Sequence, residues 1–346
     1  MTLDGGIDPH REYALVEQPA DDIRDAMNVW VEADDSSVAM RLGIEALGAN
    51  WTAHDLWVDI AFADQRVLSF RGSAPNTTAR DDLGVASIMS AGGMRFDCII
   101  PFVEWRVRYQ GEVEALTAQQ LARGVVGSVS DTDERIPVDI DLQLSMQVPP
   151  WIPGTLNRDA AQFMAGSDGQ FMSPRYEQLF AAEGTTRIAG VTQAFSGKGL
   201  RIRRTGPRQF SGFRGHCWQS AVFPDGRAFG YNTYPPEPGA QQHYREGFIF
   251  NGKERIPAVP VEIPWLRELR AAGDDISCAL ETDAGEVVRI NGNTFINTRS
   301  RSHVSLPPDF PVVQQAHARY VWEGASTVGM IERSSLPTLI QHTEAS

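Results

Sequence analysis

Residues 215–231 have the sequence GHCWQSAVFPDGRAFGY, in which aromatic and aliphatic residues flank a central Asp225-Gly226. Asp-Gly tolerates the positive φ that a tight β turn requires, so this stretch predicts two strands joined by a hairpin. Asn251-Gly252 follows the apolar residues 248–250, and Asn291-Gly292 separates two further apolar runs. These stretches predict antiparallel hairpins in the second half of the chain.

Short runs of β-branched and aromatic residues extend this pattern over the rest of the chain. The 31 Gly and 21 Pro residues are spread between the runs and do not gather in one linker. Strands at this spacing, separated by turns, are typical of an all-β sandwich or barrel. The main runs are residues 29–31, 56–62, 67–70, 99–107, 138–148, 187–195, 200–202, 219–223, 228–231, 247–250, 276–280, 286–290 and 318–322.

Helical signals are few, and they suggest where the chain divides. Ser173 and Pro174 precede RYEQLFAAE, and Gly184 follows it, which is the capping pattern of a short helix. Residues 149–184 show little alternation of apolar and polar positions. We therefore predict an N-terminal β domain over residues 1–160, a linker with a short helix over 161–184, and a C-terminal β domain over 185–346.

Composition and charge exclude several classes of function. The 346 residues are 42% hydrophobic and 22% charged, enough apolar material for a folded core, and the net charge is −13. Such an acidic chain is repelled by phosphate groups, so we expect no nucleic acid or anionic membrane as partner. No run approaches the roughly 20 apolar residues of a membrane span.

The cysteines and the absence of a secretion signal favour the cytoplasm. Cys98, Cys217 and Cys278 are few and far apart, which argues against a disulfide framework or a Cys-based zinc site. The sequence contains no G-x-S-x-G, H-E-x-x-H, C-x-x-C or G-x-G-x-x-G motif. We therefore predict no metal and no organic cofactor, and the oligomeric state stays open.

Two segments of the chain echo each other. Residues 57–66 (WVDIAFADQR) and 218–227 (WQSAVFPDGR) have Trp, Phe, Asp and Arg at the same four offsets. His54 and His216 each precede the Trp closely. Either the chain contains two related β domains, or two hairpins look alike by chance.

Residues 198–208 (KGLRIRRTGPR) form a basic segment in an acidic chain. One interpretation is a solvated strand whose arginines pair with neighbouring acids. The other is a clamp for an anion or carboxylate, because the guanidinium fork matches such groups.

The densest group of chemically useful side chains lies between residues 212 and 246. Residues two apart in a strand share a face, so Arg214, His216 and Trp218 point one way, and Tyr244 and Glu246 form a second pair. If the two strands are neighbours, these residues line one cavity. A Glu in a dry pocket keeps its proton, and aromatic faces stabilise a carbocation, so the set suits acid catalysis on an apolar substrate.

Further residues extend this candidate site. Arg214, Tyr231 and, by the internal echo, Trp57 and His54 are candidate ligand contacts. The alternative is that a His and a Trp on a buried strand are ordinary core residues.

The order Gly-His216-x-Trp218, an aromatic strand pair and Tyr244-x-Glu246 resembles the carotenoid 1,2-hydratases (hydroxyneurosporene synthases). That group also includes tocopherol cyclase-like proteins and the fungal decalin-forming Diels–Alderases, and is related to lipocalins. MRLGIEALG, HDLWVDIAF, RYEQ and GMIERS look like a bacterial branch of the group.

The resemblance implies two packed lipocalin-like antiparallel β-barrel or sandwich domains with a hydrophobic pocket. It implies His216, Trp218, Tyr244 and Glu246 as catalytic residues. The family has Asp where this chain has Glu246. The additional methylene moves the acid by about 1.5 Å, and a displacement of this size can lower the rate of catalysis. This change argues against carotenoid hydration. The sequence also shows no obvious membrane-attachment segment, so we expect a smaller terpenoid, steroid or aromatic substrate in place of a long carotenoid.

Three functions follow from these patterns. The first is a cofactor-independent lyase (hydratase) or isomerase that hydrates, isomerises or cyclises a hydrophobic molecule by proton donation. The second is a non-catalytic binder of hydrophobic small molecules, as lipocalin-like barrels are. The third is a structural or protein-interaction domain, which needs no sizeable closed pocket.

Overall fold

The computed structural model describes residues 2–117, 135–165, 174–207, 213–236, 243–299 and 310–341. Strands dominate these residues, with one short α-helix and three 3-10 helices, which confirms the predicted all-β class. The helices are η1 (Pro9–Glu12), η2 (Gly48–Asn50), α2 (Arg158–Ala165) and η4 (Pro337–Leu339).

The first β unit is a ten-stranded antiparallel sheet with the order β4-β3-β2-β1-β10-β9-β8-β7-β6-β5. An additional pairing of β4 with β7 joins two distant strands of the same sheet and so curls the sheet around an apolar core. We call this unit the sheet. Its strands are β1 (Ile23–Ala33), β2 (Val38–Leu47), β3 (Ala53–Phe62), β4 (Arg66–Pro75), β5 (Ile88–Ala91), β6 (Met94–Ile100), β7 (Glu104–Thr117), β8 (Arg135–Met146), β9 (Arg175–Ile188) and β10 (Val191–Pro207).

The second unit is a closed barrel in which each strand pairs with the next and β18 returns to β11. Its interior is filled by a second apolar cluster that includes Phe229, Tyr231 and Tyr320. We call this unit the barrel. Its strands are β11 (Gly215–Val222), β12 (Ala228–Thr233), β13 (Arg245–Phe250), β14 (Arg255–Glu262), β15 (Cys278–Thr282), β16 (Val287–Arg299), β17 (Val312–Trp322) and β18 (Ala325–Ser335).

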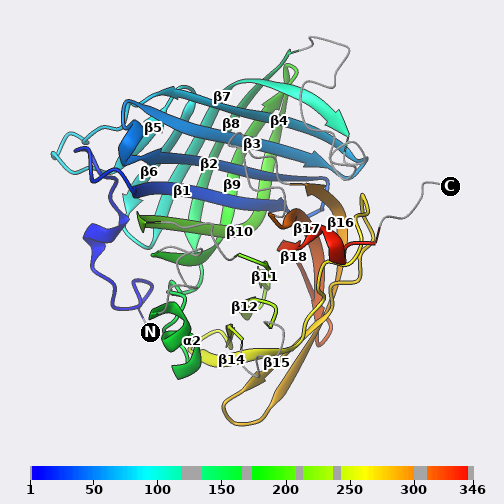
Figure 1. Ribbon diagram of the computed structural model, residues 1–346. Coiled ribbons are helices and arrows are strands. Elements are labelled where there is room, and N and C mark those ends of the chain that lie inside the picture. The colour runs from blue at the N-terminus through cyan, green and yellow to red at the C-terminus, as the bar shows by residue number, and fades with distance from the viewer. Residues whose placement is uncertain are drawn as a thin grey trace.

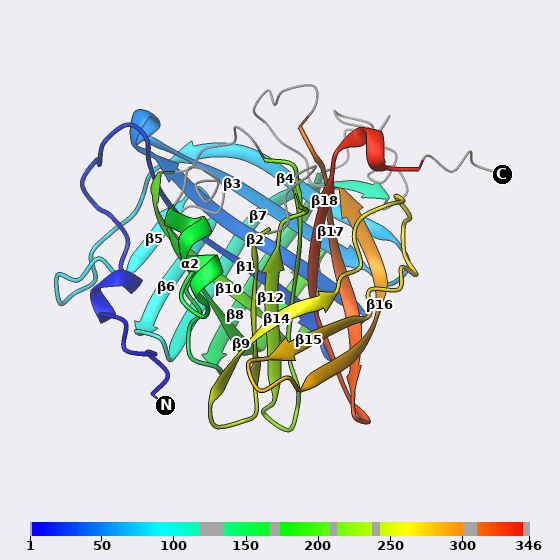
Figure 2. The same ribbon diagram turned by 60° about the horizontal axis from the view of Figure 1, so that its bottom comes forward.

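The barrel packs against one face of the sheet. Figure 1 shows the blue-to-green sheet above the yellow-to-red barrel, and the view in Figure 2 brings barrel strands β14 to β16 in front of the sheet. β1 and β10 of the sheet lie against β18 and β11 of the barrel. Every residue of β11 and β12 is buried, because one face of each strand lines the barrel and β11 also meets the sheet.

Two expectations about the middle of the chain are wrong. The predicted helix after Pro174 is strand β9, while the short helix α2 lies earlier in the chain. The first six residues of β9 are all buried where they pair with β10, and this burial outweighs the local capping pattern. The hydrogen-bonded pairing changes from sheet to barrel between Pro207 and Gly215. The first unit therefore includes β9 and β10, whereas the prediction began the C-terminal domain at residue 185.

The hairpin turns agree with the sequence at two of three places. Gly226 and Gly252 have φ values of 85° and 92° and connect β11 to β12 and β13 to β14. Asn291 and Gly292 instead lie inside β16. A Cβ added at Gly292 would come within 2.9 Å of the Tyr320 ring, so this glycine permits close packing of β16 on β17 and does not form a turn.

Candidate functional site

The four predicted catalytic residues lie in or next to barrel strands β11 and β13. Strand register places Glu332, Trp218, Asn232 and Glu246 in one row across β18, β11, β12 and β13. β12 therefore separates the two strands that were expected to be neighbours. Trp218 and Glu246 are two strand spacings apart, about 10 Å, and do not meet.

Trp218 connects the barrel to the sheet. Its Nε1 donates a hydrogen bond to Oε2 of Glu177 over 2.9 Å, and the Arg175 guanidinium lies 5.1 Å from its ring. Its ring meets that of Trp30 edge to face at 6.1 Å. Burial raises the pKa of Glu177, although its ion pair with Arg175 opposes this.

His216 is held between two side chains of β18. Its Nδ1 lies 2.6 Å from Oγ of Ser334, and its Nε2 lies 3.0 Å from Oε1 of Glu332. Gln315 donates to the other oxygen of Glu332 over 2.7 Å. Burial alone would raise the pKa of Glu332, but the hydrogen bond and charge of His216 and the charge of Arg41 lower it to about 2.

Glu246 and Tyr244 form a separate group. The carboxylate of Glu246 accepts the backbone N–H of Gly154 over 2.5 Å, that of Leu156 over 2.6 Å, and the hydroxyl of Tyr244 over 2.9 Å. Burial raises the pKa of Glu246, and these hydrogen bonds oppose the rise. Both oxygens are engaged in holding the loop before α2 against β13, and the Tyr244 ring packs on Phe163 of α2.

The four candidate ligand contacts do not form one site. Tyr231 lies inside the barrel, where its hydroxyl is 2.7 Å from Nε2 of Gln219. His54 and Trp57 are three residues apart in β3, so their side chains lie on opposite faces of the sheet. His54 is buried, and the Trp57 ring lies beside Arg41 on the face that meets the barrel. Arg214 precedes β11, and its buried Nε has no hydrogen-bond partner among the described residues.

The sequence analysis missed a buried acid–imidazole pair that joins the two units. Oε1 of Glu32 in β1 lies 2.7 Å from Nδ1 of His317 in β17. Oε2 of Glu32 is also buried and has no hydrogen-bond partner among the described residues. Burial raises the pKa of Glu32, and His317 opposes the rise. The His317 ring lies 5.7 Å from Trp30 and 6.3 Å from Phe295.

An arginine between two indoles continues this group along the sheet. The Arg41 guanidinium lies 5.2 Å from the Trp30 ring and 5.3 Å from the Trp57 ring. The Trp57 indole passes over Gly43, where an added Cβ would come within 2.0 Å of it. Arg41 Nη1 also lies 3.4 Å from Gln315 of the barrel.

We call this whole group the junction cluster. Most of its side chains are buried, but Arg41, Trp57 and Glu332 are partly exposed and form its rim. Two hollows in the described part of the chain have volumes of about 230 and 350 Å³, and the junction cluster lines neither. The members are Trp30, Glu32, Arg41, Trp57, Arg175 and Glu177 of the sheet and His216, Trp218, His317 and Glu332 of the barrel.

The internal echo has a structural counterpart. In both hairpins the Asp accepts the backbone N–H of the Arg two residues later and a second hydrogen bond from its Nε, at Asp64–Arg66 and at Asp225–Arg227. The two echoed indoles, Trp57 and Trp218, both belong to the junction cluster, one from each unit.

A family model matches residues 25–337, which is most of the chain, and its description is a domain of unknown function, DUF7064. The chain belongs to the DUF7064 family. No curated protein matches this DUF7064 chain. No helix among the described residues is long and apolar enough to cross a membrane, and no three His, Cys, Asp or Glu side chains there gather as metal ligands would.

Solved structures share the fold. A protein assigned as AttH from Nitrosomonas europaea aligns with a TM-score of 0.55 and 12% identity over 91% of this chain and 92% of its own. CghA aligns with a TM-score of 0.54 and 11% identity over 96% and 95% of the two chains. Kievitone hydratase from Nectria haematococca aligns with a TM-score of 0.48 and 8% identity over 90% and 88%. The lipocalin-related fold that the sequence resemblance implied is thereby confirmed.

Proposed function

We propose that this DUF7064 chain binds a hydrophobic small molecule at the junction cluster and transfers a proton to it without a cofactor. The observation that carries the proposal is the Glu32–His317 pair. Each unit contributes one member of a buried acid–base pair, and the second oxygen of the acid has no partner among the described residues. A titratable pair shielded from water is what acid catalysis on an apolar substrate requires.

Glu32 would act as the proton donor. The carboxyl proton passes to one carbon of an alkene, forming a C–H bond and leaving a cation at the neighbouring carbon. Loss of a proton from the next carbon gives the isomer, and addition of water with loss of its proton gives the alcohol. The proton returns to Glu32 through His317, which lies within hydrogen-bond reach.

The indoles would hold the substrate and stabilise its charge. The Trp30 ring lies 5.7 Å from the His317 ring and 6.1 Å from the Trp218 ring, so two indoles lie beside the imidazole that pairs with Glu32. A cation near an indole face gains about 0.5–2 kcal/mol. The steroid, terpenoid and aromatic molecules expected from the sequence present the apolar surface that such faces bind.

The proposal moves the acid from Glu246 to Glu32. Glu246 already accepts hydrogen bonds on both oxygens, so we assign it a structural role in holding residues 154–156. The fold itself is compatible with a bound small molecule, since CghA has been crystallised with Sch210972.

Solvent deuterium distinguishes these assignments. A panel of apolar alkenes of the terpenoid, steroid and aromatic classes is incubated with the protein in D₂O, and products are examined by mass spectrometry for deuterium on carbon. General acid catalysis contributes about 10²–10⁴ in rate, so Glu32→Gln should lower incorporation at least about 100-fold. Glu246→Gln serves as the matched carboxyl-to-amide control and should retain incorporation per folded molecule.

Other outcomes would contradict the assignment. Full incorporation in Glu32→Gln with loss in Glu246→Gln would return the acid role to Glu246. Saturable binding of panel members, without deuterium in any of them, would favour the non-catalytic binder.

A further inference from the structure

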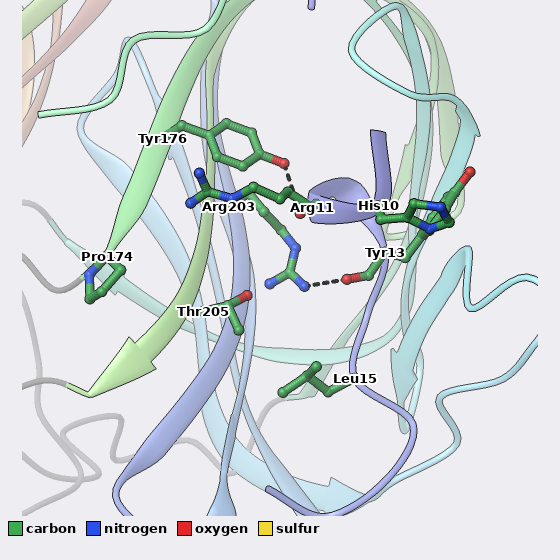
Figure 3. Close-up of a pocket in the computed structure, with 8 residues that line it drawn as sticks. All are labelled: His10, Arg11, Tyr13, Leu15, Pro174, Tyr176, Arg203 and Thr205. Carbon is green, nitrogen blue, oxygen red and sulfur yellow. Dashed lines mark hydrogen bonds between the residues drawn. The ribbon is translucent and has the colours of Figure 1, made fainter. Parts of the chain in front are cut away.

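A hollow of about 230 Å³ lies where the N-terminal segment crosses β9 and β10, away from the junction cluster. Figure 3 shows its walls, which include Arg11, Leu15, Pro174, Tyr176 and Arg203. The N-terminal residues that line it precede residue 25, where the match to the DUF7064 family model begins.

The 3-10 helix η1 fixes which side chains reach the hollow. Asp8 caps the helix by accepting the backbone N–H of His10 over 2.9 Å. Glu12 points inward, where it accepts the Nε1–H of Trp105 over 2.8 Å and pairs with Arg201 at 2.8 Å. Arg11 is thereby left on the outer side.

Tyr176 and Arg11 form one wall. The Tyr176 hydroxyl donates to Oε1 of Glu12 and lies 3.2 Å from the backbone oxygen of Arg11, and the Arg11 guanidinium lies 5.9 Å from the Tyr176 ring. In Figure 3 the side chains of Arg11 and Arg203 extend into the space between Tyr176 and Thr205.

The charges around the hollow do not balance. Arg203 is buried, forms an ion pair with Asp25, and donates to the backbone oxygen of Tyr13 over 2.5 Å. Asp25 also accepts the N–H of Leu15 and the hydroxyl of Thr205, so its oxygens are occupied. Arg11 forms no ion pair with any described acidic residue, and the buried Nε of Arg203 has no hydrogen-bond partner among the described residues.

We propose that this hollow binds a small organic monocarboxylate. The carboxylate would pair with the Arg11 guanidinium beside Arg203, since guanidinium groups match carboxylates in shape and charge. The apolar body would rest on Leu15, Pro174 and the Tyr176 ring. The hollow is smaller than the roughly 300–1,000 Å³ of a drug-sized pocket, so a single ring or short chain fits best.

This assignment resolves the two interpretations of the basic segment 198–208. Arg201 serves as a partner of the buried Glu12, whereas Arg203 lines the hollow while paired with Asp25. One arginine of the segment is therefore structural, and the next contributes to an anion site together with Arg11.

Titration calorimetry of the full chain tests the site with benzoate, benzyl alcohol and inorganic phosphate as probes. Benzoate should bind saturably with one site. Benzyl alcohol, which lacks the charge, should bind at least about tenfold more weakly, because it offers the Arg11 guanidinium no charged partner. Phosphate should also bind more weakly, since it has no apolar body.

Variants of Arg11 locate the binding. Arg11 is exposed, so Arg11→Gln should keep the fold while weakening benzoate binding about tenfold or more, and Arg11→Glu should abolish it. The matched control Arg80→Gln changes another exposed arginine outside the hollow and should leave binding unchanged.

Three results would overturn the proposal: no saturable benzoate binding, equal affinity for benzyl alcohol, or full benzoate affinity in a folded Arg11→Glu variant. Tighter binding of phosphate than of benzoate would contradict the ligand class. Glu32→Gln should leave benzoate binding unchanged, so this site and the junction cluster succeed or fail separately.

Discussion

Replacing Glu246 with alanine should destabilise the protein strongly, because a fully buried carboxylate then disappears from three hydrogen bonds. The backbone N–H groups of Gly154 and Leu156 would lose their acceptor. Gly154 and Leu156 are only partly buried, so the usual net value of about 0.5–1.5 kcal/mol for one hydrogen bond applies, and the two together predict a loss of about 1–3 kcal/mol in the free energy of unfolding. Glu246→Gln keeps one acceptor oxygen and should lose about half as much.

Urea unfolding followed by tryptophan fluorescence and circular dichroism measures this loss. Glu246→Asp should also be destabilised, because the shorter side chain retreats from the two N–H groups. The control Glu286→Ala removes an exposed carboxylate from the turn between β15 and β16 and should change stability by less than about 0.5 kcal/mol. A loss below about 1 kcal/mol in Glu246→Ala would refute the structural role assigned to Glu246.

Three further predictions concern the junction cluster. The pKa of Glu332 is lowered to about 2, so its contribution of about 3 kcal/mol to the free energy of unfolding is present above pH 4.5 and is lost as the pH falls toward 2. The free energies of unfolding of the wild type and of Glu332→Gln should therefore converge as the pH is lowered through this range. A constant difference between them would contradict the pairing with His216. Burial raises the pKa of Glu32 above 4.5, so its contribution to stability is full below pH 4.5 and is lost as the pH rises through the folded-state pKa. A double-mutant cycle of Glu32→Gln and His317→Ala should give a coupling energy of about 0.5–3 kcal/mol. Additive effects of the two substitutions would mean that the two side chains do not interact. Gly43→Ala places a methyl group against the Trp57 indole, so it should lower the free energy of unfolding by about 1–3 kcal/mol and shift the tryptophan fluorescence spectrum. An unchanged spectrum would show that the indole does not lie over Gly43.

The fold class was predictable because its signals are local. Asp225-Gly226 and Asn251-Gly252 carry turn conformations in their own backbone, and the hairpins form there. β9 was mistaken for a helix because buried positions on both faces remove the alternation by which a strand is recognised. Asn291-Gly292 was mistaken for a turn because the reason for its glycine, the ring of Tyr320, lies on another strand.

The candidate site was only partly predictable because its contacts cross the whole chain. The two-residue spacing of His216 and Trp218 places them on one face, but it does not show that Glu332 and Glu177 receive their hydrogen bonds. Glu32 and His317 are 285 residues apart, and only the packing of sheet on barrel brings them together. The internal echo was a second usable signal, since Trp57 and Trp218 both reach the junction cluster.

Photo-cross-linking with benzophenone, an apolar aromatic ketone that inserts into nearby C–H bonds when irradiated, tests most directly where a hydrophobic ligand binds. Peptide mapping should place the saturable label, which excess diphenylmethane removes, on segments that contain Trp30, Trp57 or Glu332. Label confined to the barrel interior around Tyr231, or to the hollow beside Arg11, would contradict the assignment of the junction cluster as the binding site.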